Sequence, residues 1–160
     1  MKIKILSDST CDFSQQLLQQ YDIALVPLTV VKADEQFKDG ITITPADIFA
    51  HVANGGSLCS TAAVSIGEYE DIFAQYSADY DGVILVNIGS GFSACHQNAL
   101  LAAEEFPNVR VIDSQNLTTG QGLVVLKACE LAKTAASLDD MVRELEEYAS
   151  RVESSFLVDK

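Results

Sequence analysis

The chain has 160 residues, of which 48% are hydrophobic and 21% charged, and its formal net charge is −13. This length and this mixture indicate a single globular domain with a sizeable core rather than a disordered chain. Nucleic acid and anionic membranes are excluded as expected partners, because phosphate recognition needs clustered Lys and Arg side chains.

The hydropathy of the chain and the spacing of its cysteines indicate the cellular compartment of the protein. The first strand-like segment begins at Lys2, which leaves no room for a signal peptide, and no apolar run reaches spanning length. We therefore expect a cytoplasmic protein that is not an integral membrane protein. The cysteines lack metal-ligand spacing, so we expect reduced thiols and no metal site. They are Cys11, Cys59, Cys95 and Cys129.

The first third of the chain is predicted to contain strands before and after one helix. Lys2–Asp8 is a short apolar run that predicts a strand, and "QQLLQQY" predicts a helix after it. Ile23–Val31 is rich in branched residues and predicts a second strand, which Pro27 places at a sheet edge or a bulge. The turn signal Asp39-Gly40 allows the following "ITI" to pair back as a hairpin.

Helix start and stop signals mark the rest of the chain. Thr44 with Pro45 predicts one helix start, Gly55-Gly56 its end, and Ser65 with Glu68 a capping box. "DGVILVNI" and "VRVID" predict buried strands on either side of a helix over 94–106. "GQGLVVLKACELA" predicts an enclosed helix, and Ser137 caps a last helix with one apolar stripe. The stripe residues are Leu138, Met141, Val142, Leu145, Tyr148, Ala149 and Val152.

Strands that alternate with helices predict an α/β fold, with a mostly parallel sheet and helices on both faces. Ligands of such sheets bind at the carboxyl ends of the strands. Hydroxyl-rich loops are expected at or near that edge, and we regard them as the candidate site. They are Asp8–Asp12, Ser57–Ser65, Gly89–Ser93 and Asp113–Thr119.

Two of these loops fit a dinucleotide site. Gly89-x-Gly91-x-x-Ala94 follows a predicted strand, opens a helix and precedes the acidic Asp113, as in nicotinamide-binding domains. The fingerprint normally opens the first strand–helix unit, however, and here two strands precede it. A nicotinamide-dependent oxidoreductase domain is therefore kept as the alternative function.

A serine hydrolase is a second enzymatic hypothesis, with Ser93 as nucleophile, His96 as base and Asp113 as orienting acid. Ser93 and His96 are three residues apart across a helix start and need not face each other. The GxSxG elbow of such enzymes is absent from "IGSGF".

An anion site is the third hypothesis. Serine and threonine hydroxyls, together with backbone amides at a helix N-terminus, hold a carboxylate or phosphate without a cationic side chain. Ser65 and Ser137 are explained by helix capping alone. Ser93 is placed to cap the helix from Ala94 and can also face a ligand.

Taken together, the loops resemble those of the DegV family of bacterial fatty-acid-binding proteins. "SDSTCD" resembles the family's "DSTAD" loop, and "YDIALVPLTV" and "FKDG" resemble "YGIxVVPLxV" and "YxDG". "STAAVSIGEYEDIF" resembles "TSQPSxGxF", and "VNIGSGFSACHQNA" resembles "IxISSxLSGTYQSA". "VIDSQNLTTGQG" resembles "VIDSxxxSxGxG". These segments occur in the family's order and span nearly the whole chain.

The resemblance implies a carrier of a long-chain fatty acid rather than an enzyme. In the family, hydroxyls fix the carboxylate, no cofactor is needed, and a partner fatty acid kinase makes an acyl-phosphate for phospholipid synthesis. The head-group positions fall on Thr61 and Ser93, and Asp8, Ser9 and Ser90 are supporting candidates. Asp8 would repel a carboxylate directly, so we expect it to order its loop.

The chain also departs from the family pattern. Ala62, Ala63 and Val64 replace the polar part of one loop, and Gly89, Ala94 and Cys95 replace Ser, Gly and Thr in the other. The resemblance further implies that 1–160 is the N-terminal domain and that the family's second domain is missing. A lone lobe is expected to form a homodimer or bind more weakly, unless the last helix closes the site.

Overall fold

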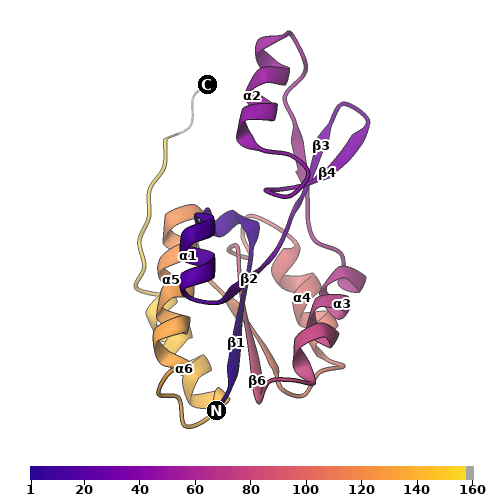
Figure 1. Cartoon of the computed structure of the whole chain (residues 1–160). Coiled ribbons are helices and arrows are strands. Elements are labelled where there is room, and N and C mark those ends of the chain that lie inside the picture. Colours follow the sequence, from indigo (N-terminus) through magenta and orange to yellow (C-terminus); the bar gives the residue numbers. More distant parts are fainter. Residues whose placement is uncertain (158–160) are drawn as a thin grey trace.

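A parallel four-stranded sheet forms the centre of the protein, in the spatial order β2-β1-β6-β7 (Figure 1). The computed structural model describes residues 1–157. The four strands are β1 (Ile3–Asp8), β2 (Ile23–Val26), β6 (Gly82–Asn87) and β7 (Val109–Asp113). Every residue of β6 is buried, because helices cover both faces of the sheet. The expected α/β fold is confirmed.

Each face of the sheet has its own hydrophobic core. One face packs against α1 (Gln15–Gln20), α5 (Thr118–Leu131) and α6 (Leu138–Ala149). The other face packs against α3 (Ile66–Ser77) and α4 (Cys95–Ala103). Neighbouring strand residues enter opposite cores, as Ile5 and Leu6 do on β1, because side chains alternate along a strand. The stripe of α6 lies inside the first core, so it does not close the candidate site.

A small lobe projects beyond the carboxyl end of the sheet (Figure 1). It holds an antiparallel sheet in the order β4-β3-β5 and the helix α2 (Pro45–Ala53). Its strands are β3 (Thr29–Lys32), β4 (Glu35–Lys38) and β5 (Ser60–Ala62). No residue of α2 is buried, and Phe49 is 73% exposed. The body therefore carries both cores, and the lobe is an extension with little core of its own.

The single strand expected over Ile23–Val31 is wrong. The chain divides at Pro27, with β2 in the main sheet and β3 in the small one. Pro27 has no N–H to give to a ladder, so one continuous strand there would leave a gap in its hydrogen bonding. The apolar composition of the segment shows that it is extended but not that it crosses between two sheets.

The expected hairpin is also wrong in its position. β3 pairs with β4, and the turn falls at Ala33, whose φ of 53° lies in the left-handed region. Gly40 makes a separate turn with a φ of 71°, and Ile43 makes only an isolated bridge to Asp39. The polar residues of β4 concealed it, because both of its faces are partly open to solvent.

The predicted helix caps are confirmed. Thr44 with Asp47 and Ser65 with Glu68 form complete capping boxes, and the Ser137 side chain accepts a hydrogen bond from the backbone N–H of Asp140. The helix α2 ends before Gly55, whose φ of 86° suits glycine. These signals are local, so the sequence carries them without tertiary information.

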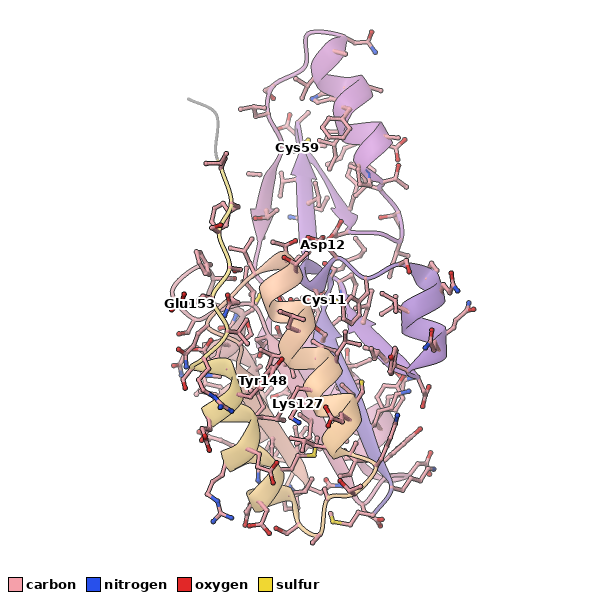
Figure 2. All side chains as sticks on the ribbon, turned by 90° about the vertical axis from the view of Figure 1, so that its left-hand side faces the viewer. Cys11, Asp12, Cys59, Lys127, Tyr148 and Glu153 are labelled. Carbon is pink, nitrogen blue, oxygen red and sulfur yellow. The ribbon has the colours of Figure 1, made fainter. Side chains whose placement is uncertain are left out.

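The cysteines are free, and three of them are buried. Figure 2 shows Cys59 in the lobe and Cys11 in the body, well apart. Burial raises the pKa of the Cys11 thiol and raises that of Cys129 to about 11. At neutral pH both therefore stay protonated and behave as small apolar side chains.

A buried carboxylate joins the sheet to α5 at the carboxyl edge. Asp8 is fully buried at the end of β1, and its side chain accepts four hydrogen bonds. The donors are the Thr10 hydroxyl, the Asn87 amide (3.1 Å), the Ile88 backbone N–H (2.7 Å) and the Gln121 amide (2.7 Å). We call Asp8 and these donors the Asp8 network. It fixes the start of the loops after β1 and β6.

Replacing Asp8 tests the weight of this network. Asp8→Ala removes the acceptor of four hydrogen bonds and leaves the buried Ile88 backbone N–H without its acceptor, so we expect unfolding to become easier by about 3 kcal/mol or more. Chemical denaturation of Asp8→Ala and of the exposed-site control Asp79→Ala measures this. Equal stability of the two variants would contradict the proposed weight of the network.

Candidate functional site

Three neighbouring strands of the main sheet end side by side in polar residues. β1 ends at Asp8, β6 at Asn87 and β7 at Asp113, and Asn87 and Asp113 are register partners. The loops expected at this edge after β1, β6 and β7 are found there. Ser57–Ser65 is not the loop that was expected: it contains β5 and belongs to the sheet of the lobe, which projects beyond this edge (Figure 1).

Thr61 lies at the centre of β5, paired with Val30 of β3, and is exposed. Within residues 1–157 its hydroxyl has no hydrogen-bond partner. The segment after β5 is tied to α4, because the Asn98 side-chain amide donates to the carbonyl of Val64 at 2.8 Å. This bond anchors the segment between β5 and α3 to the helix that follows Ser93.

Ser93 lies half-buried in the loop before α4. Its Oγ accepts the backbone N–H of Cys95 at 3.2 Å, and its O–H donates to the Cys95 sulfur at 3.2 Å. Sulfur is a weak acceptor, so a ligand oxygen can take the hydroxyl proton at little cost. Ser93 therefore caps α4 and can offer a donor to a ligand.

Ser90 points at Asp113 rather than at open space. The Asp113 carboxylate accepts the Ser90 hydroxyl at 2.6 Å, the Ser90 backbone N–H at 3.1 Å and the Gln115 backbone N–H at 2.8 Å. Burial acts to raise the pKa of this carboxyl, but these bonds outweigh it and hold the pKa below the usual value. Both donors of Ser90 are thus engaged within the protein.

Asp8 and Ser9 are also engaged internally. Asp8 is the centre of its network, and the Ser9 Oγ accepts the backbone N–H of Leu28 at 3.2 Å. The structure therefore separates the five sequence-predicted residues. Asp8 and Ser90 hold the chain around them, and Ser9 does so as an acceptor only. Thr61 is exposed, and Ser93 gives its proton only to a weak sulfur acceptor.

Three residues of this edge were not predicted: Asn87, Tyr69 and Gln121. The Asn87 amide donates to Asp8 and to the Tyr69 hydroxyl at 3.0 Å, and burial raises the pKa of Tyr69. A signal existed for Gln121, which is the one polar side chain inside the apolar run "GQGLVVL". Its partners, however, lie more than a hundred positions away in the sequence.

The geometry gives no support to the dinucleotide alternative. Asp113, the expected ribose acid, is occupied by Ser90 and Gln115. Gly89 is needed for a different reason, since a Cβ there would lie 2.9 Å from the carbonyl carbon of Gln115. A Cβ on Gly91 would meet nothing within 4 Å. Gly89 is thus required because its lack of a side chain lets two loops approach each other closely.

The hydrolase hypothesis also lacks its geometry. The Ser93 hydroxyl bonds to Cys95 and Asp113 bonds to Ser90, so the expected pairs with His96 are not formed among residues 1–157. The described residues contain no group of three or more His, Cys, Asp or Glu that could hold a metal ion. None of the helices in that part of the chain is long and apolar enough to cross a membrane.

Comparison with known proteins gives one consistent result. Residues 2–160 match the model of a family described as "Uncharacterised protein, DegV family". A DegV domain-containing protein of Clostridium perfringens is 33% identical over 156 residues, which are 96% of this chain and 56% of that protein. Protein DegV of Bacillus subtilis is 32% identical over 162 residues, covering 99% and 58%.

Solved structures give the same family. The Thermus thermophilus structure described as showing fatty acid binding of a DegV family protein superimposes with a TM-score of 0.85 at 33% identity. DegV from Bacillus subtilis, described as a fatty acid binding protein, has a TM-score of 0.86 at 31% identity. In both cases the match covers 94% of this chain and 54% of the other. The chain thus spans about half the length of these relatives.

The two glycines of the loop provide a matched test of its construction. Gly89→Ala forces a Cβ against the backbone at 115–116, and we expect a loss of about 1–3 kcal/mol in the free energy of unfolding. Gly91→Ala meets open space and should change stability by less than about 0.5 kcal/mol. Thermal unfolding of both variants measures the difference, and an equal effect would refute the close-approach role of Gly89.

Proposed function

Because the chain belongs to the DegV family, we propose that it binds a long-chain fatty acid and holds the carboxylate with Thr61 and Ser93. The observation that carries the proposal is the division of hydroxyls at the site. Ser90 gives its hydroxyl proton to Asp113, whereas Ser93 gives its proton only to the weak acceptor Cys95 Sγ. The exposed Thr61 hydroxyl has no hydrogen-bond partner within residues 1–157. The whole-chain likeness to two structures described as fatty acid binding supports the same ligand class.

The start of α4 favours an anion beside Ser93. The helix has nine residues, no acidic residue in its first turn, and no side-chain cap on Ala94. The Cys95 N–H is already accepted by the Ser93 Oγ, so the following N–H groups of the first turn and the helix dipole add to the hydroxyls in attracting a carboxylate. This arrangement lets a protein with a net charge of −13 bind an acid without a cationic side chain from these loops.

The acyl chain supplies most of the affinity. Each buried methylene contributes about 0.8 kcal/mol, whereas a hydrogen bond to a charged group contributes about 1.5–3 kcal/mol. Phe92, next to Ser93, is 55% exposed and stacks edge-on with Phe156 at a ring-centroid distance of 6.5 Å. An apolar surface thus begins directly beside the proposed head-group site.

We propose a carrier rather than a catalyst. Its role is to present the carboxylate to a partner fatty acid kinase. There a carboxylate oxygen attacks the γ-phosphorus of ATP, the bond to ADP breaks, and acyl-phosphate and ADP form. Ser93 bonds to Cys95 and not to a base, which fits binding better than nucleophilic attack.

Two further proposals concern the cellular compartment and the oligomeric state of the protein. Four free cysteines fit a reducing compartment, and we propose a cytoplasmic location.

Phe49 and Leu58 of the lobe are exposed by 73% and 84%, and we propose that such apolar surface supports a homodimer. Sedimentation of the purified chain distinguishes monomer from dimer.

Ligand class is the first test. We expect organic extracts of the purified protein to contain fatty acid by mass spectrometry, and calorimetry to show fatty acid binding but no binding of NAD. A chain that binds NAD and no fatty acid would overturn the proposed function.

Removal of either head-group hydroxyl is the second test. We expect Thr61→Ala and Ser93→Ala each to weaken fatty acid binding by about 1–3 kcal/mol without loss of fold. Ser60→Ala is the matched control, because this exposed neighbour points to the opposite face of β5. Unchanged affinity in both head-group variants, with normal thermal unfolding, would place the carboxylate elsewhere.

Transfer to the kinase is the third test. With a fatty acid kinase and ATP, we expect the loaded protein to support acyl-phosphate formation, which hydroxylamine trapping measures. The Ser93→Ala variant at saturating fatty acid should lower this rate, because its carboxylate is less well oriented. Equal rates would argue against presentation by Ser93.

A further inference from the structure

The carboxyl edge contains a clamp between two loops that the proposed ligand contacts do not explain. Asp113 ends β7 and accepts three hydrogen bonds, two of them from Ser90 in the neighbouring loop. Resting on the proposed function, we infer that Asp113 is a positioning residue, which acts through Ser90 to set where Ser93 presents its hydroxyl.

Asp113 is unsuited to touch the ligand itself. Its carboxylate would repel the carboxylate of a fatty acid, and its oxygens already accept the Ser90 hydroxyl and the amides of Ser90 and Gln115. The described residues place no Lys or Arg within ion-pair distance of it. Hydrogen bonds from the two loops therefore stabilise the charged Asp113 carboxylate. The carboxylate in turn holds these loops in a fixed position relative to each other.

The clamp fixes the loop at its first two residues. The Gly89 backbone N–H donates to the Asn116 carbonyl at 2.7 Å, and Ser90 is held by Asp113. The Phe92 N–H then turns back to the Gly89 carbonyl at 2.9 Å. Ser93 follows directly, so its position depends on where residues 89 and 90 are anchored.

The second loop of the clamp, residues 113–116, is itself held in place. Asn116 donates to the carbonyls of Ser114 at 3.0 Å and Val152 at 3.1 Å, and its oxygen accepts the Ser154 hydroxyl at 2.7 Å. The 113–116 loop is thus braced against the segment after α6, whose Glu153 is marked in Figure 2. A loop held in this way can position the neighbouring 89–93 loop as precisely as head-group recognition requires.

The test compares two ligands that differ only in the head group. Equilibrium dialysis with oleic acid and oleyl alcohol measures both affinities for the full chain and its variants. We expect Asp113→Ala and Ser90→Ala each to weaken oleic acid binding about tenfold, while oleyl alcohol binding changes less than about twofold. The double variant should lose little more than Asp113→Ala, because Asp113→Ala already removes both bonds from Ser90, whereas Ser90→Ala removes only the hydroxyl bond.

Two more variants, Asp113→Asn and Asp71→Ala, complete the design. Asp113→Asn keeps one acceptor oxygen and should give an intermediate loss. Asp71→Ala removes an exposed carboxylate of α3 and should bind both ligands normally. If Asp113→Ala does not fold, Ser90→Ala still tests the clamp, because Asp113 then keeps its bond to Gln115.

The outcomes separate the inference from the proposed function. Selective loss of oleic acid binding supports positioning of the head group. Equal loss for acid and alcohol would mean that the clamp only stabilises the fold, and unchanged binding in both clamp variants would refute any role. A wild-type chain that binds neither ligand would instead overturn the proposed function, and this inference with it.

Discussion

The buried Asp8 carboxylate is the interaction on which the arrangement of the carboxyl edge depends. It is fully buried without a cation in contact, and its charge is compensated by four hydrogen bonds. Removing an ionised group from water is costly, so the fold is bound to supply all of these donors together. The donors come from the turn after β1, from the end of β6 and the residue that follows it, and from α5, so the requirement locks the strand ends and the enclosed helix into one geometry.

From this fixed edge the hydroxyl-rich loops divide into two functions. Ser90 donates its hydroxyl proton to Asp113 and the Ser9 Oγ accepts the backbone N–H of Leu28, and both bonds hold the loops in place. Thr61 and Ser93 stand on the resulting frame with donors to offer. Such a division suits a strongly acidic chain, because neutral donors and a helix start can bind a carboxylate where clustered cations are lacking. In the proposed site the lobe contributes Thr61 and the body contributes Ser93.

The sequence by itself determined the fold class, the strands β1, β6 and β7, and the helix caps. These depend on short-range rules: an apolar run between turns is a strand, and a Ser or Thr three residues before an acid starts a helix. The ordered loop motifs likewise identified the family from residues alone. The sequence also singled out Thr61 and Ser93 as head-group candidates, and their role remains a prediction.

Only the tertiary structure decided how these parts meet. Pro27 marked a break, but that the chain changes sheets there depends on what β3 and β5 pair with. Gly89 looked like part of a nucleotide fingerprint, because a glycine pattern does not state which atoms approach the missing side chain. Gln121 joined Asp8 across more than a hundred positions, and Asp113 proved to be bound to Ser90. Such contacts join residues far apart in the chain, and local periodicity and capping rules carry no information about them.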